Sequence, residues 1–316
     1  MTVANPYRND PSGALQQTGL RRLATYASLG TALTLIVIKL IAFLLTDSVS
    51  LLASLIDSTI DAFSSLIIMV GVYHATQPPD KEHRYGHGKY EAIASLTQAM
   101  FIAGSGVFLV YESLQRFVHP QSVHHPMIGI GVMVASIVLT LALVIFQHYV
   151  IRKTDSVAIA SDSIHYKGDL LMNLAVIVAL ASGSYTSWPY VDPIIALAIA
   201  GFLLYGAWGI GKQSIDILVD RELPDEDRQK ITEIVLEHDR VRDIHDLRTR
   251  NSGLHLFIEF HMEVDHHMNI LEAHDITETI EAKLHRAFPT SEVVIHPEPY
   301  GIQDDRLDDR IADSDE

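Results

Sequence analysis

The chain has 316 residues, of which 48% are hydrophobic and only 20% are charged, and its mean hydropathy is +0.19. Such a composition is unusual for a soluble protein of this length and favours a membrane protein. The formal net charge of −16 argues against nucleic acid as a partner, because phosphate binding needs clustered basic residues. The sequence contains no cysteine, so any metal site must be built from histidine and carboxylate side chains.

Six apolar stretches occupy the first two thirds of the chain, each near the roughly 20 residues that a helix needs to cross a bilayer. We expect six transmembrane helices, over residues 24–46, 51–74, 92–117, 127–150, 157–183 and 193–210. The first stretch is too long for a cleaved signal peptide and leads directly into the second. The chain therefore divides into an N-terminal cytoplasmic segment (1–20), a transmembrane domain (21–218), a cytoplasmic domain (219–300) and an acidic tail (301–316).

The basic residues between the apolar stretches predict the orientation of the helices in the bilayer. On one side lie Arg21, Arg22, Lys81, Arg84, Lys89, Arg152, Lys153, Lys212 and Arg221. The opposite loops at 46–50 and 182–192 contain no basic residue. By the positive-inside rule, we expect both termini to be cytoplasmic.

From residue 223 onward the sequence is typical of a small α+β domain. Pro224, Asp225 and Glu226 favour the start of a helix that continues to about residue 238. Two strands are predicted around the turn at 251–253, followed by a second helix and a last strand. Their expected ranges are 241–250, 254–264, 269–288 and 292–296. This gives an αββαβ order with helices over one face of a small sheet, followed by a tail whose aspartates favour disorder.

Ionisable residues inside apolar helices are costly, at about 2.5 to 3.5 kcal/mol each on insertion scales, and they are rarely kept without a function. The second stretch contains Asp57 and Asp61, and the fifth contains His165 and Asp169. An i,i+4 spacing places both members of each pair on one helix face. Two such helices that face each other would present three carboxylates and one imidazole, which suits a tetrahedral zinc site.

A structural interpretation of these four residues is that they pair with a base or sit in water at a helix end. Lys39 is the only base within an apolar run, and one lysine cannot neutralise three acids. Asp162 and Lys167 lie near His165, but residues in such places are more often structural, so we do not assign them as ligands. The metal-site interpretation is therefore favoured.

Two further groups of residues have the chemistry of a metal site. Asp80, His83 and His87 share a short loop with glycines, where they either converge on one ion or form an ordinary polar loop. Nine of the 17 histidines follow Leu223. Among them, His245, His261, His274 and His296 lie at or near predicted strands or helices. A single histidine in such a place is often only solvated, but their density favours metal binding.

Several motifs, spread over residues 20–300, together resemble the cation diffusion facilitator family. They are DSTID at 57–61, YGHGK at 85–89, HYKGD at 165–169, LPDE at 223–226 and HDLRTR at 245–250. The resemblance implies a homodimer that alternates between inward-facing and outward-facing states. It also implies a metallochaperone-like fold for the cytoplasmic domain.

Matched position by position, the resemblance implies the role of each candidate residue. Asp57, Asp61, His165 and Asp169 match the transport site. The loop site is matched by Asp80, His83 and His87. A paired zinc site at the dimer interface is matched by His245, His261, His274 and His296, with Glu298 at a position that is often Asp in the family.

These ligands predict a mechanism. Metal binding requires a neutral His165 and ionised carboxylates, so protons and metal compete for one site. We expect a proton-coupled antiporter that exports Zn²⁺, or else Cd²⁺ or Fe²⁺, across a bacterial inner membrane. The cytoplasmic zinc sites would then be regulatory.

Three alternatives to this function stay open at the level of sequence. A membrane-embedded zinc hydrolase is disfavoured because the sequence contains no H-E-x-x-H motif, and we expect no enzyme. A metal-responsive receptor with a membrane anchor is disfavoured because charged residues lie inside two separate spans. Import rather than export remains possible, since orientation does not fix the direction of transport.

Overall fold

The computed structural model describes residues 11–46, 49–118, 127–183, 190–301 and 306–314. The predicted loops at 46–50 and 182–192, and Asp304 and Asp305 of the acidic tail, lie wholly or partly outside these ranges. Two compact units make up the chain, a helical unit (Gln16–Ile215) and a C-terminal unit that contains Asp216–Glu316. Each unit is described by itself.

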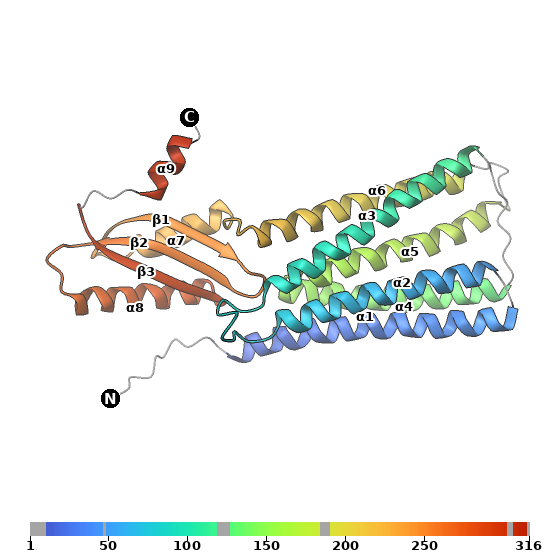
Figure 1. Cartoon of the computed structure of the whole chain (residues 1–316), viewed down its shortest axis with the longest axis horizontal. Coiled ribbons are helices and arrows are strands. Elements are labelled where there is room, and N and C mark those ends of the chain that lie inside the picture. The colour runs from blue at the N-terminus through green and yellow to red at the C-terminus, as the bar shows by residue number, and fades with distance from the viewer. Residues whose placement is uncertain (1–10, 47–48, 119–126, 184–189, 302–305, 315–316) are drawn as a thin grey trace. The chain divides into compact units, whose positions relative to one another are not determined.

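The helical unit contains a helix for each of the six predicted apolar stretches (Figure 1). They are α1 (Pro11–Thr46), α2 (Val49–Ala75), α3 (Lys89–Val118), α4 (Met127–Thr154), α5 (Val157–Gly183) and α6 (Val191–Leu218). When only the described residues are considered, five of these helices, all except α5, are long and apolar enough to cross a membrane. The N-terminal half of α5 contains Asp162, Lys167 and Asp169, which lower its apolar character.

Small residues let the helices of this unit approach one another closely. A Cβ atom added to Gly71 on α2 would lie 2.3 Å from the Cβ atom of Ala94 on α3. One added to Gly168 on α5 would lie 2.5 Å from a methyl group of Leu203 on α6. Close backbone approach through small residues is the usual mode of packing between membrane helices.

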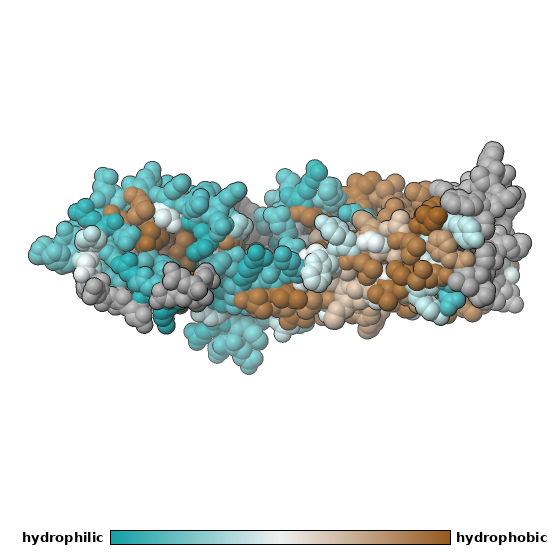
Figure 2. Space-filling view, turned by 90° about the horizontal axis from the view of Figure 1, so that it is seen from above, coloured by the Kyte–Doolittle hydropathy of each residue, from teal (hydrophilic) through white to brown (hydrophobic). Residues whose placement is uncertain are grey.

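Large apolar side chains cover the outside of the helical unit. Leu45 on α1 is 74% exposed, and Trp208 on α6 is 75% exposed. Figure 2 shows hydrophobic residues gathered over this unit and hydrophilic residues over the C-terminal unit. An apolar exterior of this extent is unfavourable in water and suits contact with lipid.

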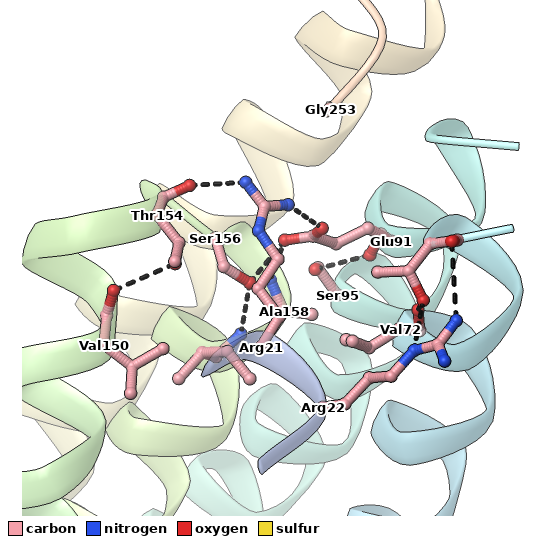
Figure 3. A network of polar contacts seen from close by, with 12 residues as sticks. Arg21, Arg22, Val72, Glu91, Ser95, Val150, Thr154, Ser156, Ala158 and Gly253 are labelled. Carbon is pink, nitrogen blue, oxygen red and sulfur yellow. Dashed lines mark hydrogen bonds and ion pairs between the residues drawn. The ribbon is translucent and has the colours of Figure 1, made fainter. Parts of the chain in front are cut away.

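A buried ion pair joins four helices of the unit (Figure 3). Nη1 of Arg21 on α1 donates to Glu91 on α3 at 2.5 Å, and both side chains are less than 5% exposed. The second guanidinium nitrogen donates to the backbone carbonyl of Thr154, the last residue of α4. The other carboxylate oxygen of Glu91 accepts from Ser156 Oγ at 2.5 Å and from the Ala158 N–H at 3.3 Å, at the start of α5. One carboxylate thus connects α1, α3 and the junction of α4 with α5.

The C-terminal unit has the predicted αββαβ order. Its elements are α7 (Asp225–Leu236), β1 (Val241–Asn251), β2 (Leu256–Val264), α8 (Ile270–Ala287), β3 (Ser291–Pro299) and the additional α9 (Leu307–Ser314). The sheet has the order β1-β2-β3, in which β2 pairs antiparallel with β1 and parallel with β3. The parallel pair requires a crossover connection, and α8 provides it.

Apolar side chains from α7, α8 and all three strands form the core of this unit. The buried members include Ile231 on α7, Phe260 on β2 and Ile280 on α8. The start of α8 is fixed by a capping box, in which Asn269 accepts from the Glu272 N–H and the Glu272 side chain accepts from the Asn269 N–H. Satisfying the free N–H groups at a helix start in this way stabilises it.

The expectation that residues 301–316 form a disordered tail is wrong for residues 307–314, which form α9. Reciprocal hydrogen bonds hold this helix to β1, since the Asp246 N–H donates to Asp308 at 2.8 Å and the Asp308 N–H donates to Asp246 at 3.0 Å. Burial of the Asp246 carboxyl raises its pKa. Hydrogen bonds from the backbone N–H groups of Leu307 and Asp308 act in the opposite direction, and the resulting pKa lies below its ordinary value. The acidic composition of residues 301–316 predicts disorder and gives no indication of these contacts.

Glu91→Gln should destabilise the helical unit, because it leaves the Arg21 guanidinium buried without its counter-charge. Breaking one side of a buried ion pair costs about 3 to 5 kcal/mol. We therefore expect a clear fall in the melting temperature of the purified protein in detergent. The matched control is Glu82→Gln, since Glu82 is exposed on the loop between α2 and α3. Equal melting temperatures for the two variants would contradict this account of the network.

Candidate metal-binding sites

Two helices bring three of the predicted transport-site residues together inside the helical unit. One ligand atom from each of Asp61, His165 and Asp169 lies within 4.8 Å of the others, and we call this group the helix cluster. His165 Nε2 lies 3.0 Å from an oxygen of Asp61 and 3.6 Å from an oxygen of Asp169. The i,i+4 spacing of His165 and Asp169 on α5 positions both side chains toward α2.

The helix cluster lines a cavity of about 860 Å³ in the helical unit. Asp57, one turn from Asp61 on α2, lines the same cavity but does not join the three-residue group. Lys39 also lines it, and its Nζ donates to Ser58 Oγ at 2.5 Å and to the Ser54 carbonyl at 3.2 Å. Lys39 is 8% exposed, so it is directed inward rather than toward the surface of the unit.

The buried imidazole of the helix cluster fits a cation. Within the described ranges, His165 Nε2 has no hydrogen-bond partner, although carboxylate oxygens lie close to it. A buried polar atom without a partner is rare in folded proteins and calls for an explanation. A metal ion held between the imidazole and the carboxylates would satisfy all of these atoms at once.

The loop between α2 and α3 brings together Asp80, His83 and His87, which we call the loop cluster. His83 Nδ1 and His87 Nε2 each lie 3.3 Å from an oxygen of Asp80. Gly86 has a φ of +82°, a conformation that favours glycine, and it turns the chain so that His87 faces back toward Asp80. Backbone hydrogen bonds, first from His83 and then from Glu82, hold the pKa of Asp80 below its ordinary value.

Strand register places three predicted histidines in a row across the sheet of the C-terminal unit. His245 on β1 pairs with His261 on β2, which in turn pairs with His296 on β3. The ring centroids of neighbouring histidines lie 5.1 and 4.9 Å apart. Side chains directly opposite each other on adjacent strands share one face, so the row follows from the register.

His245, His261 and Glu298 form a third group with converging ligand atoms, which we call the sheet cluster. Oxygens of Glu298 lie 2.8 Å from His261 Nδ1 and 3.4 Å from His245 Nε2. These nitrogens are buried and have no hydrogen-bond partner among the described residues, which fits a metal here as well. Glu298, whose carboxylate lies close to both histidines, is therefore central in this cluster.

Two predicted ligands, His296 and His274, do not join the converging ligand atoms of the sheet cluster in the single chain. His296 is 64% exposed, although its Nε2 lies 3.3 Å from an oxygen of Glu298. His274 on α8 is 62% exposed, and its nearest charged partner is Glu278 on the same helix at 4.0 Å. Neither residue contributes to the group of converging atoms.

Sequence reasoning missed two charged residues beside the sheet cluster. Glu263 is buried on β2, and its carboxylate lies 3.6 Å from His245 Nδ1. Arg306, which precedes α9, forms ion pairs with Glu263 and with Asp243. The i,i+2 spacing of His261 and Glu263 on one strand could have revealed the first residue. No local pattern indicates the second, because its partner lies 43 positions away.

Comparison with known families accounts for both units. Residues 25–219 match the family model described as the cation efflux transmembrane domain. Residues 223–300 match the model described as the cytoplasmic domain of cation efflux proteins. Together the two models cover nearly the whole of the described chain.

Curated proteins of similar length are also alike in sequence. The cation-efflux pump FieF of Shewanella oneidensis is 43% identical over 282 residues, which cover 89% of this chain and 95% of that protein. FieF of Salmonella arizonae is 42% identical and covers 88% and 93%. A solved structure described as the zinc form of the putative zinc transporter CzrB is 36% identical over 27% of this chain and 98% of its own, with a TM-score of 0.26. That score is too low to support a structural inference.

The family match extends over both units and the sequence identity over most of the chain. The C-terminal unit corresponds to the cytoplasmic domain of the family, and the helical unit to its membrane domain. The chain therefore belongs to the cation diffusion facilitator family of cation-efflux transporters, as an integral membrane protein and not an enzyme.

Proposed function

We propose that this protein is a proton-coupled antiporter that exports a divalent transition metal, with Zn²⁺ as the first candidate, from the cytoplasm. The convergence of Asp61, His165 and Asp169 in a cavity of the helical unit carries the proposal. Three titratable groups gathered among apolar helices are costly unless a cation or protons neutralise them. A transported cation is the simplest reason to keep them together.

The types of ligand support zinc as the cargo. Asp57 lines the same cavity, and with it the site would offer three carboxylates and one imidazole. Zinc accepts four nitrogen and oxygen ligands in a tetrahedron, whereas magnesium prefers six oxygens and retains several waters. Cd²⁺, Fe²⁺ and Mn²⁺ can use the same groups, so the choice among these metals is a matter for measurement.

Proton exchange follows from the same ligands. An imidazole nitrogen that binds metal must be free of a proton, and so must each metal-binding carboxylate oxygen. Metal and protons therefore compete for Asp61, His165 and Asp169. If the cavity opens in turn to each side of the membrane, this competition exchanges one metal ion for protons and uses the proton gradient to expel metal.

The proposed membrane arrangement has six spans and places both termini in the cytoplasm. It includes α5, because His165 and Asp169 line the cavity and Asp162 is buried, so that these residues would not face lipid. The positive-inside distribution of basic residues supports the orientation. The relatives are cation-efflux pumps of bacteria such as Shewanella and Salmonella, which supports a bacterial inner membrane.

We assign the cytoplasmic domain a regulatory role in a homodimer. The sheet cluster would bind zinc through His245, His261 and Glu298, and exposed His296 and His274 would complete a paired site together with a second copy of the chain. Metal binding to these clusters would draw the two cytoplasmic domains together. The loop cluster would bind a further ion near the cytoplasmic ends of α2 and α3.

Asp61→Ala and His165→Ala should each abolish coupled transport. Removing one ligand from a four-ligand site is expected to lower zinc flux by on the order of 100-fold. The measurement is zinc uptake into proteoliposomes with an imposed proton gradient, while internal pH is followed at the same time. The native chain should show zinc flux with opposite proton movement.

Lys167→Gln is the matched control for this experiment, since Lys167 lies on α5 between the two ligands but does not line the cavity. This variant should transport zinc at nearly the native rate. The proposal would be contradicted if zinc binds to the native chain but never crosses the liposome membrane. Equal zinc flux in all variants would also contradict it.

His245→Ala should weaken zinc binding to the cytoplasmic domain more than His274→Ala. The reason is that His245 lies within the sheet cluster, whereas His274 lies apart from it in the single chain. The measurement is the zinc affinity of the full chain in detergent, determined by competition with a chromophoric chelator. Equal losses of zinc affinity in both variants would instead show that His274 contributes to the site as much as His245 does.

A further inference from the structure

A second carboxyl group on α5 is buried in the helical unit outside the helix cluster. Asp162 is 0% exposed, and it lies three positions before His165 on α5. It does not line the cavity that contains the helix cluster. A buried carboxyl group among apolar helices is a candidate functional residue, because the charged form is costly there.

Neutral polar groups from two other helices surround one oxygen of this carboxyl. Oδ2 of Asp162 accepts from Ser28 Oγ on α1 at 2.5 Å and from Gln147 Nε2 on α4 at 2.7 Å. Ser28 Oγ lies 3.2 Å from Ser65 Oγ on α2, which lies 2.9 Å from the hydroxyl of Tyr166. All of these side chains are no more than 1% exposed.

Two acceptor atoms of this network have no donor. Oδ1 of Asp162 and Oε1 of Gln147 are both buried, and neither has a hydrogen-bond partner among the residues described. A proton on Oδ1 would turn that acceptor into a donor. The two unpaired acceptors in contacting side chains therefore fit a carboxyl group that holds a proton.

No basic group forms an ion pair with this carboxyl, and the titratable base on its own helix, His165, lies one turn away. Throughout the described part of the chain, no nitrogen of Lys, Arg or His lies within ion-pair distance of the Asp162 carboxyl. By contrast, the other fully buried carboxyl at the ends of these helices, that of Glu91, is paired with Arg21. An ionised Asp162 would thus be a buried charge without a directly paired counter-charge.

From this geometry we infer that Asp162 is a proton-binding residue of the exchange cycle, separate from the metal ligands. In the described conformation Oδ1 carries the proton. One helical turn separates Asp162 from His165, so a divalent cation in the helix cluster would favour the ionised carboxylate through space. The proton then leaves Oδ1 for water, and it returns when the metal departs; no electrons are transferred.

This inference rests on the proposed antiport, but its test does not depend on transport. Asp162→Asn keeps the shape of the side chain and an acceptor oxygen while removing the exchangeable proton. Infrared difference spectra of the full chain in detergent, with and without zinc, should show a protonated-carboxyl band that zinc removes. The band should be absent from Asp162→Asn and shifted in Asp162→Glu.

A second readout counts the protons released when zinc binds, using a pH indicator in weak buffer. Asp162→Asn should release one proton fewer per bound zinc than the native chain. Ser163→Ala is the matched control, since Ser163 is equally buried next to Asp162 on α5 and its hydroxyl has no hydrogen-bond partner among the described residues, and it should release the native number. Asp162→Glu, which keeps a titratable group, covers the case in which the Asn variant fails to fold.

The outcomes separate this inference from the proposed function. If zinc flux and proton counterflow occur in the native chain but the band and the proton count are unchanged in Asp162→Asn, the inference is wrong and the antiport stands. An equal loss of protons in Ser163→Ala would also overturn it, because the loss would then reflect damage to the packing of α5 rather than loss of the Asp162 carboxyl. If the native chain shows no antiport but zinc still removes the assigned band, the transport proposal fails and the proton site remains.

Discussion

The cost of placing charge among apolar helices is the constraint on which the helical unit depends. Water is not available there to solvate an ionised side chain, so each ionisable group needs a counter-charge, a proton or a bound cation. Arg21 and Glu91 satisfy this need permanently, since their charges neutralise each other, and Nη2 of Arg21 and the second oxygen of Glu91 bond to helix ends. That arrangement is suited to holding helices in register.

The helix cluster satisfies the same need differently. Asp61, His165 and Asp169 face one another with buried Lys39 in the same cavity, and the described residues leave His165 Nε2 without a hydrogen bond. Their charge balance is therefore open to adjustment by a cation or by protons. This contrast between a closed ion pair and an open cluster is the physical basis for assigning structure to one and transport to the other.

The cytoplasmic domain uses strand register rather than helical periodicity to gather its ligands. Because β2 is central, His261 has neighbours on both sides, and Glu298 reaches it from β3. The bulge on β1 between His245 and Arg248 gives Asp246 a positive φ of 52° and directs it toward α9. The C-terminal helix is thereby fixed one residue away from a candidate ligand.

Local spacing explains what the sequence could predict. The i,i+4 pairs on α2 and α5, the helices over the apolar stretches and the αββαβ order all depend on periodicity within one element, and the described structure has each of them. The described residues of α5, however, do not reach the apolar length of the other five helices. Contacts between distant residues left no local signal. Glu91 lies 70 positions from Arg21, and Arg306 lies 43 from Glu263, so neither pair was predictable. In the proposed homodimer, the placement of His274 depends on a second chain, which one sequence does not specify.

The central claim is that the helix cluster binds the transported metal, and X-ray absorption at the zinc edge tests it most directly. The sample is the full chain carrying Asp80→Ala, His83→Ala, His245→Ala and His261→Ala, which disable the other two clusters. The account predicts one retained zinc with four nitrogen and oxygen ligands at about 2.0 to 2.2 Å, including one imidazole. A chain that retains no zinc, or one whose zinc environment is unchanged by His165→Ala, would contradict it.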